Sequence, residues 1–110
     1  MPEGDLRLST RSLPSGGTVV LVAGELDLST VSALESELAS AAPGRIVIDL
    51  SECAFLDSSA LRALVVAHRA STEAGASFVL AAPSAAIRRV LQLASIDRVI
   101  PVTDNVDDGR

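Results

Sequence analysis

One stretch, residues 46–61, constrains the fold more than any other part of the sequence. It starts with the short and mostly β-branched apolar run Ile46-Val47-Ile48-Asp49-Leu50, which predicts a strand buried on both faces. The pattern then changes to that of one helical face, because Leu61, Leu64, Val65 and His68 fall at positions i, i+3, i+4 and i+7. Because a buried strand followed by an amphipathic helix is typical of α/β domains, we expect a sheet with helices packed on it.

Three polar residues, Asp57, Ser58 and Ser59, lie between this strand and this helix. Asp and Ser side chains accept hydrogen bonds from the free N–H groups of a first helical turn, so all three can act as caps. The structural interpretation is that they do no more than this. The functional interpretation is that Ser58 is a modification site, since two adjacent hydroxyl groups exceed what capping requires. The residue chemistry alone leaves both interpretations open.

The sequence before this stretch predicts a hairpin and a helix. Strands are expected over 6–9 and 18–23, joined by a turn at 14–17. Ser29 or Thr30 can then cap a helix that carries Val31, Leu34 and Leu38 on one face and ends at 43–44. The carboxylates of Glu25 and Asp27, between strand and helix, are expected to be solvated.

The sequence after it continues the alternation. Gly75 is expected to end the central helix, and a strand follows over 77–81. Pro83-Ser84 opens a further helix with its apolar face at Ile87, Val90, Leu91 and Ala94, and a short edge strand is expected over 99–102. We therefore predict a single α/β domain over 1–110, with a mixed sheet of about five strands, an ordered core over about 5–102 and an acidic, frayed tail over 103–110.

Composition excludes several functions. The net charge is −5, and the nine basic residues are all Arg and mostly scattered, so no basic surface for nucleic acid is expected. The single Cys53 rules out an internal disulfide, and we interpret it as a small buried apolar residue in the loop before Asp57. Neither a signal peptide nor an apolar run long enough to span a membrane is present, which favours a soluble cytoplasmic protein.

Two motifs carry a resemblance to a known family. Residues Phe55-Leu56-Asp57-Ser58-Ser59-Ala60-Leu61, preceded by the strand at 46–50, resemble the signature of the bacterial anti-sigma factor antagonists of the STAS-domain family. Gly24-Glu25-Leu26-Asp27 matches the second motif of that family at the end of the preceding strand. The family pattern has glycine at the position of Ala60, which bears on how closely a partner backbone can approach there. Relatives usually continue into a further C-terminal helix.

The resemblance implies partner switching in transcription regulation. The unphosphorylated form would bind an anti-sigma factor serine kinase and release a sigma factor, phosphorylation of Ser58 would switch this binding off, and a serine phosphatase could reverse it. The free protein is expected to be a monomer without a cofactor. The residues implied in partner binding are Gly24, Glu25, Asp27, Asp57, Ser58, Ser59 and Leu61.

Two alternatives come from other classes. A serine hydrolase would use Ser58 or Ser59 with an oriented base, but the Gly-x-Ser-x-Gly motif is absent and His68 would lie roughly 15 Å from Ser58 along a helix. We expect His68 to pack at the core boundary, no catalytic residue and no metal site, and therefore no enzyme. The remaining alternative is a STAS subunit of a signalling scaffold or a lipid-transport complex, in which the serines are only caps. Weak nucleotide binding also stays open.

Overall fold

A single five-stranded sheet organises the domain. The computed structural model describes residues 6–41 and 43–106. The strands lie side by side in chain order, as β1 (Leu6–Ser12), β2 (Thr18–Leu26), β3 (Ile46–Leu56), β4 (Phe78–Ala81) and β5 (Val102–Thr103). β1 and β2 pair antiparallel as a hairpin, and the other neighbours pair parallel. The predicted α/β fold with a mixed sheet of about five strands is therefore confirmed.

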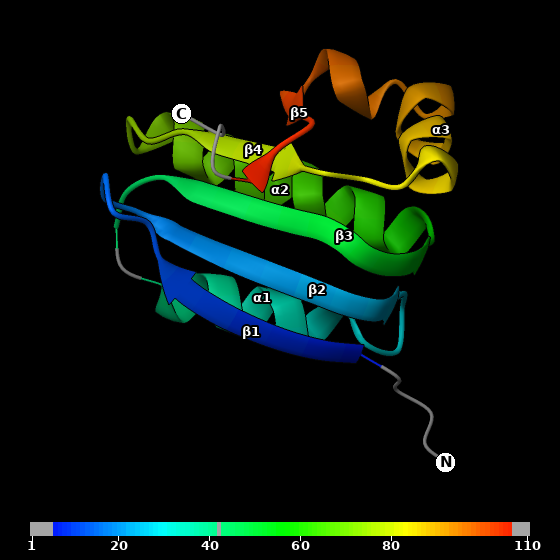
Figure 1. The fold of residues 1–110 in the computed structure, drawn as a ribbon, viewed down its shortest axis with the longest axis horizontal. Coiled ribbons are helices and arrows are strands. Elements are labelled where there is room, and N and C mark those ends of the chain that lie inside the picture. The colour runs from blue at the N-terminus through cyan, green and yellow to red at the C-terminus, as the bar shows by residue number, and fades with distance from the viewer. Residues whose placement is uncertain (1–5, 42, 107–110) are drawn as a thin grey trace.

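Helices cover one face of this sheet. α1 (Val31–Ser40) and α2 (Ser58–Glu73) lie behind it in Figure 1, and α3 (Ala85–Leu93) and the 3-10 helix η1 (Ile96–Arg98) lie between β4 and β5 in the chain. Leu34, Leu64 and Leu91, one from each α-helix, pack into the same cluster as strand residues such as Ile48. Each such buried side chain contributes about 1.5–3 kcal/mol relative to an exposed one. This aliphatic core holds α2 firmly against the strand that precedes it.

The opposite face carries a smaller apolar cluster. Val19, Val47 and Val79 are buried there beside Leu13, and Val106 packs against them from beyond β5. Val47 belongs to this cluster, whereas Ile46 and Ile48, on either side of it in β3, are buried under the helices. β3 is therefore buried on both faces, as its β-branched sequence predicts.

The central strands are longer than predicted. β3 runs to Leu56 rather than ending at residue 50, because it keeps pairing with β2 through two register shifts. Such bulges rotate a strand, so the regular alternation that marks a strand in the sequence is lost after Leu50. Cys53 consequently lies in β3 and not in a loop. Its burial is confirmed: the Sγ atom donates to the Phe55 carbonyl at 3.4 Å, and burial raises the pKa of the thiol.

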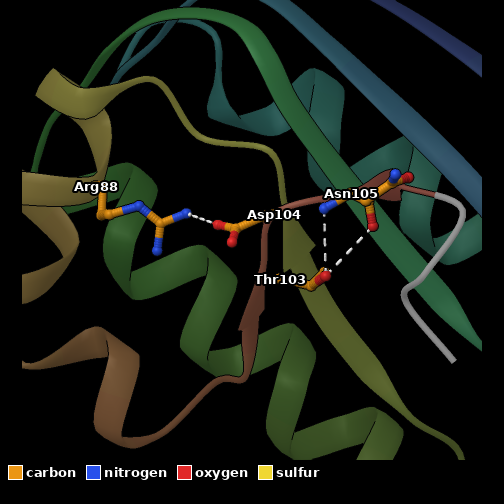
Figure 2. Close-up of polar contacts among 4 residues, drawn as sticks. All are labelled: Arg88, Thr103, Asp104 and Asn105. Atoms are coloured by element: carbon orange, nitrogen blue, oxygen red, sulfur yellow. Dashed lines mark hydrogen bonds and ion pairs between the residues drawn. The ribbon is translucent and has the colours of Figure 1, made fainter.

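The C-terminal part also differs from the prediction. The edge strand lies at 102–103, after η1, so the predicted boundary at 103 falls inside β5. Beyond it, Arg88 of α3 forms an ion pair with Asp104, and the Thr103 side chain bonds to Asn105 (Figure 2). Asp104 and Val106 therefore contact the rest of the fold, while the predicted limits of the ordered core stay a prediction. Ala94, predicted on the buried face of α3, is exposed. The predicted start of the core at residue 5 and the end of the tail, 107–110, lie outside the described residues.

Within the described ranges, no helix is both long and apolar enough to cross a bilayer.

Candidate functional site

The junction between β3 and α2 is capped by one residue, Asp57. Its backbone is extended, with φ of −110° and ψ of −175°, and its Oδ1 atom accepts from the Ala60 N–H at 3.0 Å. Ser58 is the first residue of the helix. The predicted capping at this junction is confirmed, and because Asp57 already supplies the cap through the Ala60 N–H, neither serine is needed for it.

The two serine hydroxyls are consequently free. Ser58 is exposed and Ser59 is half-buried. Neither side chain forms a hydrogen bond with any other residue in the described part of the chain. The Ser58 hydroxyl thus stands in solvent at the N-terminal end of a 16-residue helix, where backbone N–H groups and the helix dipole favour negative charge.

Asp57 also joins this junction to the one between β2 and α1. Its Oδ2 atom accepts from the Leu28 N–H at 3.0 Å, across 29 positions of sequence. The Asp57 N–H in turn donates to the Leu26 carbonyl at 3.3 Å. The parallel pairing of β2 with β3 makes this contact possible, because the carboxyl ends of parallel strands lie at one edge of the sheet. The two sequence motifs therefore form a single site.

The β2–α1 junction uses its polar side chains internally. The Asp27 Oδ1 atom accepts from the Ser29 hydroxyl at 2.8 Å and from the backbone N–H groups of Ser29 and Thr30. Hydrogen bonding, above all from the Ser29 hydroxyl, lowers the pKa of Asp27. The prediction that Ser29 or Thr30 caps α1 is confirmed for the position, since Thr30 is the N-cap residue. Its side chain makes no cap bond to the first turn, so the capping interaction itself is absent.

The Thr30 side chain points back into the turn. Its hydroxyl donates to the Glu25 carbonyl at 2.9 Å and accepts from the Asp27 N–H at 2.9 Å, and the residue is buried. Asp27 is accordingly a structural residue of this turn rather than a freely solvated carboxylate, while Glu25 is exposed.

Gly24 allows β2 to bend into this turn. Its φ of 109° is a conformation that side chains other than glycine rarely adopt, and the pairing with β3 shifts register between Gly24 and Glu25. The residues predicted for partner binding are thus gathered around Asp57, with Glu25 and Ser58 exposed and Gly24, Asp27, Asp57, Ser59 and Leu61 half-buried. Their role in binding stays a prediction.

Two exposed apolar side chains near the site were missed by sequence reasoning. Leu28, bonded through its N–H to Asp57, is 75% exposed, and Phe55, two residues before Asp57, is 48% exposed. Single exposed apolar side chains are normal on protein surfaces, so these two add apolar area beside the site without by themselves defining a docking patch. Leu28 is a single apolar residue between the polar residues Asp27 and Ser29, and this isolated position in the sequence could have indicated that its side chain is exposed.

Other expectations concern residues beside the site. Ala60 is fully buried in the main core, so its methyl group faces inward and adds nothing to the outer surface. The His68 ring packs edge-on against Phe78, with centroids 6.0 Å apart, which confirms its predicted place at the core boundary. No cluster of three or more potential metal ligands occurs among the described residues.

Comparison with known proteins agrees with this geometry. The family model described as "Mlab, STAS domain" matches residues 9–102, so the chain belongs to the STAS-domain family. An anti-sigma factor antagonist from Mycobacterium paratuberculosis is 29% identical, with a TM-score of 0.84 over 98% of this chain and 93% of that one.

Two more distant likenesses concern the fold alone. The Bacillus anti-sigma factor antagonist SpoIIAA, in its unphosphorylated form, is 19% identical with a TM-score of 0.72 over 87% of each chain, and its phosphorylated form is also similar. A sulfate transporter family protein from Wolinella succinogenes is 15% identical with a TM-score of 0.77 over 90% of this chain and 85% of that one.

Proposed function

We propose that this STAS domain is an anti-sigma factor antagonist whose binding is switched off by phosphorylation of Ser58. The observation that carries the proposal is the exposed Ser58 hydroxyl at the first turn of α2, which has no hydrogen-bond partner among residues 6–41 and 43–106 and lies beside an aspartate that already caps the helix. The likeness to the M. paratuberculosis antagonist supports the same class of partner. The unphosphorylated form binds an anti-sigma factor kinase and thereby releases the sigma factor.

The covalent step belongs to the kinase. The Ser58 Oγ atom attacks the γ-phosphorus of ATP held by the kinase, the bond to the β-phosphate oxygen breaks, and ADP leaves while the hydroxyl proton passes to a kinase base. In this proposal the chain is the substrate and not an enzyme, and the packing of its histidine, His68, against Phe78 supports that role. A serine phosphatase returns the protein to its binding form.

The added charge explains how binding is lost without unfolding. A phosphate brings about −1.5 to −2 charge at neutral pH. The free N–H groups at the start of α2 tolerate it in the isolated domain. It is added beside Asp57, whose carboxylate already lies at the start of α2, on a surface that a partner must approach closely. Bulk and like-charge repulsion then oppose the complex, while the core is untouched.

A second candidate function rests on a specific observation. The matching family model is described as Mlab, and the fold is shared with a sulfate transporter family protein. In that case the chain is a STAS subunit of a larger signalling scaffold or lipid-transport complex. Its binding to the other subunits would not depend on whether Ser58 is phosphorylated.

The test is co-expression with candidate anti-sigma factor kinases encoded near its gene, followed by intact mass, phosphopeptide mapping and titration. Wild type and Ser59→Ala should gain one phosphoryl group, and Ser58→Ala none while still binding. Ser58→Asp should raise the Kd at least tenfold, equivalent to about 1.4 kcal/mol. A phosphate mapped to Ser59, or equal affinities for wild type and Ser58→Asp, contradicts the switch and puts the scaffold function first.

A further inference from the structure

One face of α2 is covered only in part by the core: Leu61 and Val65 pack against the core cluster and still border a hollow at the surface. Residues 58, 61, 62, 65, 66 and 69 recur at the spacing of one helical face and line a groove of about 410 Å³. The opposite wall is formed by Ala94 and Ile96, at the turn between α3 and η1. We call this the α2 groove. Ser58 lies at one end of it, so the groove starts at the proposed switch.

The floor of the α2 groove is apolar and accessible. Leu61 and Val65 are half-buried, and Val66 is 57% exposed. A second hollow, of about 390 Å³, shares Val65 and Arg69 with the groove and extends it towards the exposed Val99. The two hollows thus border neighbouring stretches of α2, which suits an elongated partner segment.

The charge of the α2 groove is opposite to that of the chain. The protein has a net charge of −5, yet the charged residues that line the groove are Arg62 and Arg69. Neither guanidinium forms an ion pair with any carboxylate in the described part of the chain. Glu73 lines the far hollow beyond Arg69, and both oxygens of Asp57 are occupied by backbone N–H groups. The two arginines are therefore free to receive carboxylates from another molecule.

We propose that the α2 groove is the docking site for an acidic amphipathic helix of the anti-sigma factor kinase; this inference rests on the proposed function. Apolar side chains of that helix pack on Leu61, Val65 and Val66, and two of its carboxylates pair with Arg62 and Arg69. The two arginines are seven positions apart in the sequence, which places them about 10.5 Å apart along α2. Carboxylates seven residues apart on a partner helix running along the groove match that spacing.

The walls of the groove favour a helix over an extended strand. A strand would need a free sheet edge to pair with, and here the walls are α2 and the turn at Ala94–Ile96. An amphipathic helix needs only an apolar groove and anchors at helical spacing. The position of Ser58 at the end of the groove also connects docking to the switch, because a phosphate there repels the carboxylates that approach Arg62.

The experiment titrates the kinase that phosphorylates Ser58 with purified full-length variants, at low and high salt. Arg62→Glu and Arg69→Glu should each raise the Kd about tenfold and weaken its salt dependence. Arg7→Glu, which makes the same charge change on exposed β1, should alter the Kd less than about twofold. A photo-crosslinker at Val66 should capture a kinase peptide with two carboxylates seven residues apart, and one at Thr10 on β1 should not.

The outcomes separate this inference from the proposed function. If Ser58→Asp weakens binding while both arginine variants bind as wild type, the groove proposal is wrong and the switch stands. Crosslinks from Val66 to a kinase segment without acidic residues would also overturn it. If wild type binds no candidate kinase, or Ser58→Asp has no effect, the proposed function fails and the groove proposal fails with it. Arg62→Gln and Arg69→Gln serve as second variants should charge reversal disturb folding.

Discussion

The two strand-to-helix junctions that meet at Asp57 contain the same kinds of side chains and use them differently. At the β2–α1 junction, the carboxylate of Asp27 and the hydroxyls of Ser29 and Thr30 bond to one another and to nearby backbone groups. At the β3–α2 junction, the carboxylate of Asp57 bonds to backbone N–H groups on both sides. There the serines are left without partners among the described residues.

The difference shows when a hydroxyl next to a helix is structural and when it is available. In both turns an aspartate accepts from backbone N–H groups. In the first, the Ser29 hydroxyl donates a hydrogen bond to that aspartate and the buried Thr30 hydroxyl bridges two backbone groups, so both hydroxyls are engaged. In the second, the aspartate needs no side-chain donor. The Ser58 hydroxyl can therefore be modified with little loss in the stability of the fold.

The largest expected effect is the loss of the carboxylate that joins the two junctions. Asp57→Ala should lower the free energy of unfolding by about 2 kcal/mol, because it removes a helix cap and the acceptor for the Leu28 N–H. Urea denaturation measures this directly. Asp57→Asn, which keeps one acceptor oxygen, should lose about half as much.

Ser58→Ala is the matched control for that variant, since it changes the next residue and should stay within about 0.5 kcal/mol of wild type. A loss as large as that of Asp57→Ala would mean that the Ser58 hydroxyl is structural, and the contrast between the junctions would disappear.

A smaller effect is expected for the buried threonine of the first junction. Thr30→Val keeps the shape of the side chain and removes the hydroxyl that bridges the Glu25 carbonyl and the Asp27 N–H. We expect a loss of about 1–1.5 kcal/mol in the free energy of unfolding. Thr10→Val, on the exposed surface of β1, should change it by no more than about 0.5 kcal/mol. Equal effects at the two positions would show that the bridge contributes nothing.

The smallest effect concerns pH. Hydrogen bonding from Ser29 lowers the pKa of Asp27 below its ordinary value of 3.8. A depressed folded-state pKa stabilises the fold above the unfolded-state value, and this stabilisation is lost as the pH falls through the folded-state pKa. Ser29→Ala should raise the pKa of Asp27 towards 3.8 and reduce this acid dependence. An NMR titration of the Asp27 carboxyl tests it, with Ser32→Ala as control; an unchanged pKa would contradict the assigned cause.

The order and type of the elements could be predicted from the local sequence pattern alone. Buried strands, helical stripes and the caps at Asp57 and Ser84 depend on residues within one or two turns of each other, so the local pattern was sufficient. The same holds for the hairpin and for the place of Ser58 at the start of α2. The family motifs could be recognised for the same reason.

The assembly of the site depends on contacts between segments that are far apart in the sequence. β3 reaches Leu56 only because β2 continues to pair with it past Gly24, and no local pattern in 51–56 encodes that partner. The bond from Leu28 to Asp57 and the exposure of Phe55 follow from this pairing. The same is true of the α2 groove, whose second wall comes from Ala94 and Ile96. Contacts between residues far apart in sequence depend on which strands become neighbours, and periodicity along one segment carries no information about its neighbour.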